Sequence, residues 1–137
     1  MRRLFRGLRA DQRGAAAIEF AIIGPLLLTL LLGIVEMGRM FYVRESLEYA
    51  TEQAARYYMV NPAATQDAVT TALRNAMAGG MGSSISTPTY TDVSSCNGNV
   101  AVTCTTITAT YTFVSVASFL NLGSPVLRAT AQAVRVQ

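Results

Sequence analysis

The chain has 137 residues, of which 51% are hydrophobic and 14% are charged, and its formal net charge is +3. This length is sufficient for one domain, and the composition favours a membrane-associated protein. The charge is uneven: five arginines against Asp11 leave +4 in residues 1–13, whereas the rest of the chain is close to neutral. This distribution argues against a basic face for nucleic acid.

The residue types that most catalytic sites require are scarce. Histidine and lysine are both absent, which removes histidine general bases, Ser-His and Cys-His pairs, Ser-Lys dyads and histidine metal sites. The two cysteines, Cys96 and Cys104, are too few for a zinc site of their own. We therefore expect a protein that is not an enzyme and that holds no cofactor or metal.

Residues 20–35, FAIIGPLLLTLLLGIV, contain no charged side chain. As a helix these sixteen residues cover about 24 Å, which is less than the roughly 30 Å hydrocarbon core of a bilayer. Extending the segment back to Ala15 gives about 31 Å, enough to span. The extension brings Glu19 within the edge of the bilayer.

The arginines before this segment predict its orientation. Cytoplasmic flanks of membrane helices are enriched in Arg and Lys, so we expect the N-terminus in the cytoplasm and the chain after Glu36 outside, with the span in contact with membrane lipid. A removed signal peptide is the alternative, because it also combines a basic start with an apolar middle. A retained anchor is favoured, because no small-x-small cleavage motif follows Val35 and helix-forming composition continues to Asn61-Pro62.

Beyond the span, apolar residues recur at steps of three and four, which predicts that the helix continues with one buried stripe. The stripe comprises Met40, Val43, Leu47, Ala50, Ala54 and Tyr57. A helix over residues 15–60 would be about 69 Å long. This length suits a subunit that packs against copies of itself or relatives, and a stalk covered by its own C-terminal domain is the alternative.

The remaining residues, 61–137, predict a small α+β domain outside the membrane. We expect a short second helix with Asn61 as N-cap and Pro62 in its first turn, ended by Gly79-Gly80. Alternating patterns then predict an antiparallel sheet of about three strands, at residues 87–93, 106–113 and 126–136. The fold class is therefore α+β, with a long N-terminal helix, a short second helix and a C-terminal sheet.

Two readings compete for the segment around the cysteines. Asn97-Gly98 is a strong two-residue turn signal, but such a turn would pair Cys96 with Asn99. Direct pairing of Cys96 with Cys104 would instead centre the connection near Val100. We expect a disulfide because the predicted orientation places both thiols in an oxidising compartment, with two free thiols as the alternative.

Two blocks of the sequence together resemble the N-terminal signature of the TadE-like family, pseudopilins of the tight-adherence (Flp) pilus systems. The first is RGAAAIEF at residues 13–20, and the second is IVEMGRMFYVRESLEYATEQAARY at residues 34–57. The resemblance is dense from Gly14 to about Tyr58 and loose afterwards. The first block would be a weak motif on its own, since small residues before apolar helices are common, but its position after a basic stretch and the presence of the second block make it specific.

The resemblance implies that residues 1–14 are a prepilin-type leader, cut between Gly14 and Ala15 by a prepilin peptidase. Gly14 matches the residue before the cut in the family. Glu19 matches the glutamate at the fifth position of the mature chain, and Phe20 matches the aromatic residue next to it. Cleavage would leave an ammonium group on Ala15. Because a buried carboxylate is disfavoured unless it is paired, such an amine on a neighbouring subunit would suit Glu19. Solvation of Glu19 by headgroup water is the alternative.

The resemblance further implies a minor pilin or pseudopilin whose partners are other pilus subunits and the inner-membrane assembly platform. Its three parts would be the leader, a helix over residues 15–60 and an extracytoplasmic domain over residues 61–137. Glu36 and Arg39, one turn apart, could contact another subunit or form an ordinary interfacial pair. The alternative function is an uncleaved, single-pass anchored binding or accessory module.

Overall fold

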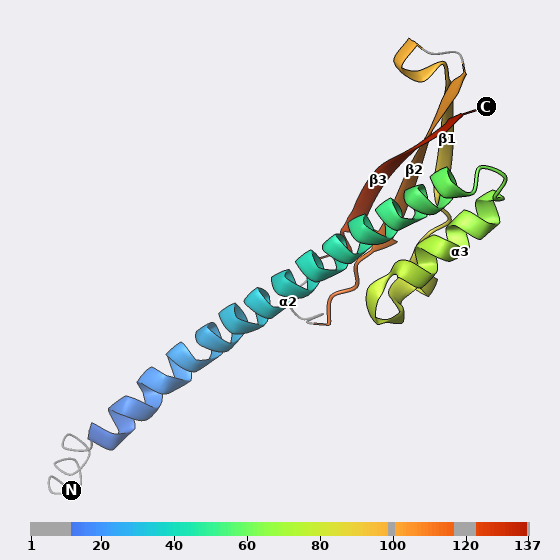
Figure 1. Cartoon of the computed structure of the whole chain (residues 1–137). Helices are drawn as coiled ribbons and strands as arrows, with labels where there is room; N and C mark the ends of the chain where they lie inside the picture. The colour runs from blue at the N-terminus through green and yellow to red at the C-terminus, as the bar shows by residue number, and fades with distance from the viewer. Residues whose placement is uncertain (1–11, 99–100, 117–122, 137) are drawn as a thin grey trace, which may run out of the picture.

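The computed structural model describes residues 12–98, 101–116 and 123–136, so the predicted leader lies almost wholly outside the described part of the chain. Figure 1 shows a long rod, α2, with a small domain along its distal half. The elements in chain order are α2 (Gln12–Val60), α3 (Gln66–Ala76), the 3-10 helix η1 (Ala78–Ser84), β1 (Thr89–Ser94), the 3-10 turn η2 (Cys96–Gly98), β2 (Val102–Thr112) and β3 (Val126–Val136). The predicted α+β class is confirmed.

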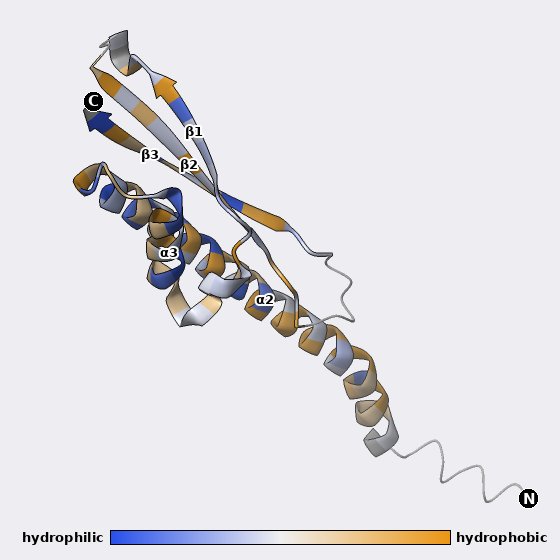
Figure 2. Cartoon of the chain, turned by 90° about the vertical axis from the view of Figure 1, so that its right-hand side faces the viewer, coloured by the Kyte–Doolittle hydropathy of each residue, from blue (hydrophilic) through white to orange (hydrophobic). Residues whose placement is uncertain are grey.

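Helix α2 has 49 residues, which corresponds to a length of about 74 Å. Its apolar proximal part is long enough to cross a membrane, and none of its most apolar window is buried by the rest of the chain. Figure 2 shows mostly apolar colouring there. Pro25 lies within the helix, and the Thr29 hydroxyl donates a 2.7 Å hydrogen bond to its carbonyl. The structure therefore contains the long helix predicted for residues 15–60.

The distal half of α2 forms one side of the hydrophobic core. Its buried side chains include Val43, Leu47, Ala50 and Ala54, as the three-and-four spacing predicted. The last member of the predicted stripe was wrong: Tyr57 is 39% exposed, whereas Tyr58 is 6% exposed. The buried residue that follows Ala54 in the stripe is Tyr58, four positions later, because its ring turns toward the sheet. There the Arg135 guanidinium lies over it, 4.2 Å from the ring centroid.

The three strands form an antiparallel sheet in the order β1-β2-β3. Tyr90, Ile107 and Ala131 are cross-strand neighbours on the inner face. Alternation also places Ala109, Ala129 and Ala133 on this face, and all three are buried. The opposite face carries the alternate residues, many of them threonines, and apart from the buried Cys104 its described side chains are exposed or half-exposed. All three predicted strands are confirmed.

The second helix begins later than the sequence predicted. Thr65, rather than Asn61, is the N-cap of α3, and its hydroxyl accepts a hydrogen bond from the backbone N–H of Ala68. Asn61 instead ends α2, because its backbone N–H and its side-chain amide both donate to the carbonyl of Tyr57, at 3.0 and 3.1 Å. Because both of these hydrogen bonds are made to the last turn of α2, Asn61 is not available as the N-cap of α3.

A glycine-rich turn follows α3 and docks it against α2. Gly79 and Gly80 both have positive φ angles, 64° and 70°, a conformation that glycine adopts without steric cost. Just before them, the backbone N–H of Ala78 donates a 2.9 Å hydrogen bond to the Ser46 hydroxyl on α2. The Gly-Gly pair thus reverses the chain next to the long helix, and Val69 and Leu73 of α3 face the core.

Candidate functional site

The predicted processing site lies near the beginning of α2. Gly14 and Ala15 are exposed, and a Cβ atom added to Gly14 would have no neighbour within 4 Å. Among the described residues, nothing packs against this part of the helix. A second protein could therefore approach the Gly14-Ala15 peptide bond without displacing any described part of the chain.

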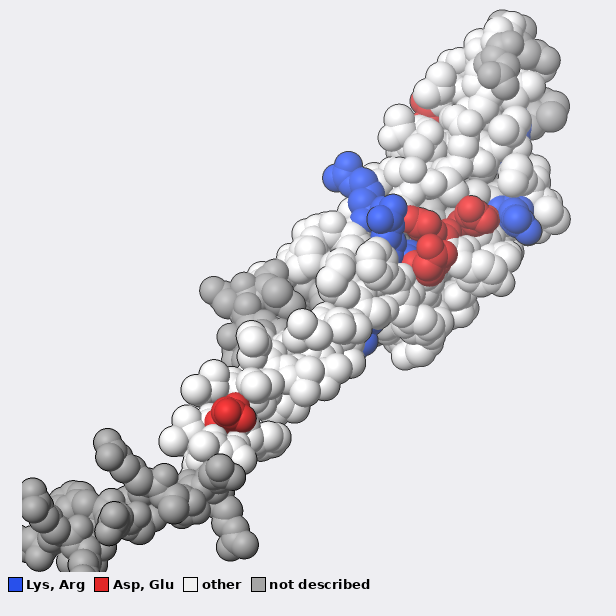
Figure 3. Space-filling view, turned by 90° about the vertical axis from the view of Figure 1, so that its left-hand side faces the viewer, with Lys and Arg blue, Asp and Glu red and all other residues white. Residues whose placement is uncertain are grey.

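Glu19 is the one charged residue in the segment 14–35. Figure 3 shows a single acidic group on an otherwise uncharged stretch of the rod. The Glu19 side chain is exposed and has no hydrogen bond or ion pair with any described residue. Phe20 is 77% exposed, and its ring extends along the helix beside Gly24. The two residues that the family resemblance assigns to assembly are thus both presented outward.

Ala15 and Glu19 lie on the same face of α2. Residues four apart in an α-helix are neighbours, one turn and about 6 Å apart along the axis. The Ala15 nitrogen is part of a peptide bond in the uncut chain and carries no charge. Cleavage before Ala15 would convert this nitrogen to an ammonium at a depth similar to that of the Glu19 carboxylate.

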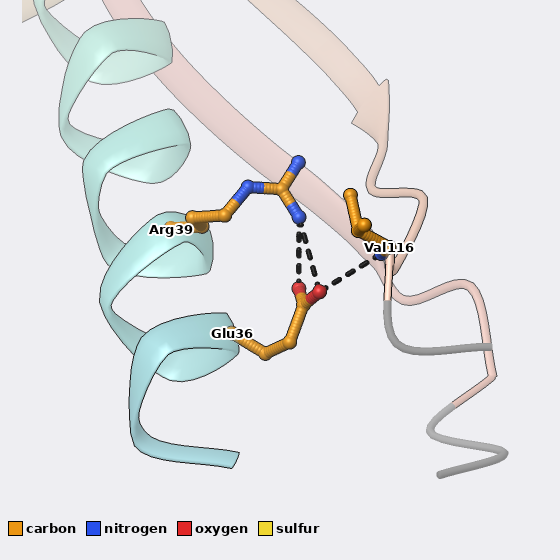
Figure 4. Close-up of polar contacts among 3 residues, drawn as sticks. All are labelled: Glu36, Arg39 and Val116. Atoms are coloured by element: carbon orange, nitrogen blue, oxygen red, sulfur yellow. Dashed lines mark hydrogen bonds and ion pairs between the residues drawn. The ribbon is translucent and has the colours of Figure 1, made fainter. Parts of the chain in front are cut away.

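A second acidic residue, Glu36, has the opposite environment. Its side chain is only 6% exposed and receives two contacts from Arg39 Nη1, 3.2 Å to Oε1 and 2.9 Å to Oε2. The backbone N–H of Val116 donates a third hydrogen bond, 2.8 Å long, to Oε1. Figure 4 shows the carboxylate between the helix and the chain after β2. Sequence spacing predicted that Glu36 and Arg39 are close, but gave no sign of Val116.

The Glu36–Arg39 pair fixes the β2–β3 connection to α2. The Arg39 guanidinium also lies over the Phe113 ring, 5.4 Å from its centroid. The backbone N–H of Phe113 donates a 2.9 Å bond to the carbonyl of Pro125, which closes the base of the connection. We name this set of contacts among Glu36, Arg39, Phe113 and Val116 the junction clasp. Within this chain Glu36 and Arg39, for which either a contact with another subunit or an ordinary interfacial pair was expected, have an intramolecular role.

A cavity of about 180 Å³ adjoins the junction clasp. Its described lining is mainly apolar and includes Met37, Met40, Phe113 and Pro125. Glu36 is the one ionisable residue in that lining, and it is engaged with Arg39 and Val116. Elsewhere in the described chain, no three His, Cys, Asp or Glu residues gather as a metal site.

The cysteines form a disulfide between η2 and β2. The Cα atoms of Cys96 and Cys104 are 5.7 Å apart, and Cys104 is buried. The two residues are not direct cross-strand partners as expected, because Val93 occupies the position opposite Cys104. Cys96 lies beyond the end of β1 in the turn with Asn97-Gly98, so turn and disulfide coexist. The alternative centre at Val100, and Asn99, lie outside the described residues.

Comparison with known proteins bears on the N-terminal half of this arrangement. No curated protein and no solved structure matches the chain. The family model described as TadE-like protein matches residues 14–56. The match begins at Gly14 and includes Glu19, Phe20, Glu36 and Arg39, and it ends before α3 and the sheet. Over this segment, which carries the exposed acid Glu19 and the Glu36–Arg39 pair, the chain is similar to TadE-like proteins.

Proposed function

We propose that this protein is a minor pilin or pseudopilin of a Tad-type pilus, cut by a prepilin peptidase between Gly14 and Ala15. The observation that carries the proposal is the Glu19 carboxylate, which has no partner among the described residues and lies on an apolar helix one turn after Ala15. A charge at the edge of the hydrocarbon core is costly without a partner. A new N-terminal ammonium supplies one of opposite sign.

The role of Glu19 follows from this pairing. In a mature subunit the Ala15 ammonium of a neighbouring chain neutralises the Glu19 carboxylate as the two apolar helices come together. Loss of the basic leader also removes charges that hold the N-terminus at the cytoplasmic surface. Glu19 and Phe20 then guide a subunit to its place among the other pilus subunits at the inner-membrane assembly platform.

The remainder of the chain serves this role without chemistry of its own. In the proposed topology the N-terminus is cytoplasmic, and α3 and the sheet lie outside the membrane. The disulfide suits that location, because such bonds persist in oxidising compartments. The junction clasp holds the external domain close to the point where α2 leaves the bilayer.

Processing is tested by producing the full chain in cells with and without the prepilin peptidase and determining the N-terminus by mass spectrometry. We expect Ala15 as the first residue when the peptidase is present. The variant Gly14→Leu should remain uncut. Gly33→Ala is the matched control, because Gly33 also has open surroundings on α2 and should not affect cleavage. A chain that keeps Met1 beside an active peptidase would contradict the proposal and indicate an anchored accessory module.

The assembly role is tested separately with Glu19→Gln, which keeps the shape of the side chain and removes its charge. The variant should be cut normally but should not support pili, as counted by electron microscopy of cells whose own copy is deleted. Glu45→Gln, an exposed acid in the distal half of α2, is the control and should support normal pili. Normal piliation by Glu19→Gln would show that the charge has no role in assembly.

A further inference from the structure

The chain that leaves β2 returns to the level at which α2 reaches the outer membrane surface. Residues 15–35 are long enough to cross the hydrocarbon core, at about 31 Å, so Glu36 lies at its outer edge. The Val116 N–H is 2.8 Å from the Glu36 carboxylate. Because this hydrogen bond is short and direct, the backbone of Val116 lies at the same depth.

The side chains after β2 alternate in their exposure. Phe113 is buried against the core and Ser115 is half-buried, whereas Val114 and Val116 are 67% and 76% exposed. Alternation along an extended segment sends successive side chains to opposite sides. Val114 and Val116 are therefore the exposed side chains of this segment at the membrane edge.

The outward side of α2 at this level, turned away from Glu36, has a composition typical of a membrane interface. Phe41 and Tyr42 are 52% and 58% exposed, and Tyr42 lies about 9 Å beyond Glu36 along the axis. Tyrosine is enriched at the level of lipid headgroups. The Arg39 side chain is 43% exposed at this level.

We propose that Val114 and Val116 form a second membrane contact, in which the β2–β3 connection inserts its exposed valines into the outer leaflet beside α2. The junction clasp makes this insertion tolerable, because the one buried acid at this depth, Glu36, is paired with Arg39 and hydrogen-bonded by the backbone. Lipid, rather than a second copy of the chain, is the favoured partner. The surface is continuous with the span, which the bilayer surrounds on all sides.

Two points of attachment would restrict the external domain. A single helix allows the domain to tilt and rotate, whereas a second contact beside the helix fixes its face toward the membrane. This inference depends on membrane anchorage alone and does not require cleavage or pilus assembly. Its failure would leave the processing and piliation experiments unaffected.

The test is depth-dependent fluorescence quenching of the oxidised full-length chain in phosphatidylcholine–phosphatidylglycerol liposomes. The environment-sensitive dye NBD is attached to the single free thiol of Val116→Cys, and the quencher is a nitroxide near the top of the lipid acyl chain. Leu28→Cys, within the span, is the positive control. Val60→Cys is the negative control, because Val60 is 79% exposed but lies about 36 Å beyond Glu36 along α2.

We expect the nitroxide lipid to quench the label at position 116 several-fold more strongly than the label at position 60. Equal quenching at the two positions would overturn the proposal. A second result would also overturn the proposal: a blue shift of the emission at position 116 that increases with the protein-to-lipid ratio and is not quenched by the nitroxide lipid. This result would identify a second copy of the chain as the partner. Circular dichroism and an intact disulfide establish that each labelled variant is folded before the comparison.

Discussion

The Glu36 carboxylate accepts a 2.8 Å hydrogen bond from the backbone N–H of Val116, a residue eighty positions later in the chain. This bond and the Arg39 ion pair attach the chain after β2 to the middle of α2. The contact defines the boundary between the half of α2 that projects alone and the half that carries the folded domain. Glu36 thus has a structural role that Glu19, also an acid on α2, does not share.

Replacement of Glu36 with alanine should destabilise the domain by about 1–3 kcal/mol, the usual cost of leaving a buried donor unsatisfied. The change removes the partner of the Val116 N–H and leaves Arg39 unpaired. Breaking a fully buried pair can cost about 3–5 kcal/mol, but Arg39 is 43% exposed and water can replace its partner, so the lower range applies.

The measurement for Glu36→Ala is urea unfolding of the full chain in detergent, monitored by circular dichroism. Glu45→Ala on the same helix is the control and should change the free energy of unfolding by less than about 0.5 kcal/mol. If the two variants have the same unfolding midpoint, the junction clasp does not contribute to stability.

Local periodicity predicted most of the fold because each element buries a face of its own. The three-and-four spacing identified Val43, Leu47 and Ala54 on α2, and strict alternation identified Ile107 on β2 and Ala133 on β3. Such patterns follow directly from the geometry of helices and strands. They required no knowledge of how the elements pack together.

The parts that the sequence did not predict depend on tertiary contacts. The bond from Val116 to Glu36 joins segments with no common pattern, and the stripe ends on Tyr58 because Arg135 stacks on it. Asn61 resembled an N-cap, but its bonds to Tyr57 assign it to the end of α2. The candidate processing residues were predicted from family resemblance, since no packing pattern distinguishes an exposed glycine.

Gly82 should not tolerate even a methyl group. A Cβ atom at this position would lie 2.1 Å from the carbonyl oxygen of Arg74 and 2.7 Å from its carbonyl carbon. Both are backbone atoms in the last turn of α3, so they cannot move away without shifting the helix. We expect Gly82→Ala to lower the stability of the domain by about 1–3 kcal/mol or more, as overpacking does.

Gly38→Ala is the matched control for this steric argument. Gly38 is within α2, and an added Cβ would meet nothing within 4 Å. Alanine should therefore be neutral or stabilise the helix by about 0.5–1 kcal/mol. Thermal unfolding of both variants gives the comparison, and a Gly82→Ala protein as stable as the wild type would contradict the close approach of η1 to α3.

The disulfide should account for a substantial part of the stability of the external domain. Cys96 and Cys104 close a loop of nine residues, which corresponds to about 2.6 kcal/mol on the chain-entropy estimate. Cys96→Ser should lower the free energy of unfolding by about this amount. Wild-type protein in reductant should match the variant, and reductant should have no effect on Cys96→Ser. A wild-type unfolding curve unchanged by reductant would contradict this role.

Tyr90 links β1 to α3 and should make the stability depend on alkaline pH. Its hydroxyl lies 2.8 Å from the Thr70 hydroxyl and donates a 3.1 Å bond to the carbonyl of Gln66. Burial raises the pKa of Tyr90 above its ordinary value of 10.0, although the Thr70 hydrogen bond opposes the shift. The folded state therefore favours the neutral phenol more than the unfolded state does.

The sign of the effect follows from proton linkage. Above about pH 10 the unfolded chain loses the Tyr90 proton before the folded chain does, so stability falls as the pH rises through the folded pKa. Tyr90→Phe should cost about 1 kcal/mol at neutral pH through the lost hydrogen bonds. The same variant should lose less stability than the wild type between about pH 9 and about pH 11.

Urea unfolding across this pH range, with Tyr49→Phe as the control, distinguishes Tyr90 from the other tyrosines. Tyr49 is 57% exposed on α2, so its replacement controls for the loss of a tyrosine hydroxyl outside the core. The difference in unfolding free energy between wild type and Tyr90→Phe should narrow with rising pH, because only the wild type has the phenol that ionises on unfolding. A constant difference would mean that Tyr90 ionises equally well in both states and that its burial has no electrostatic consequence.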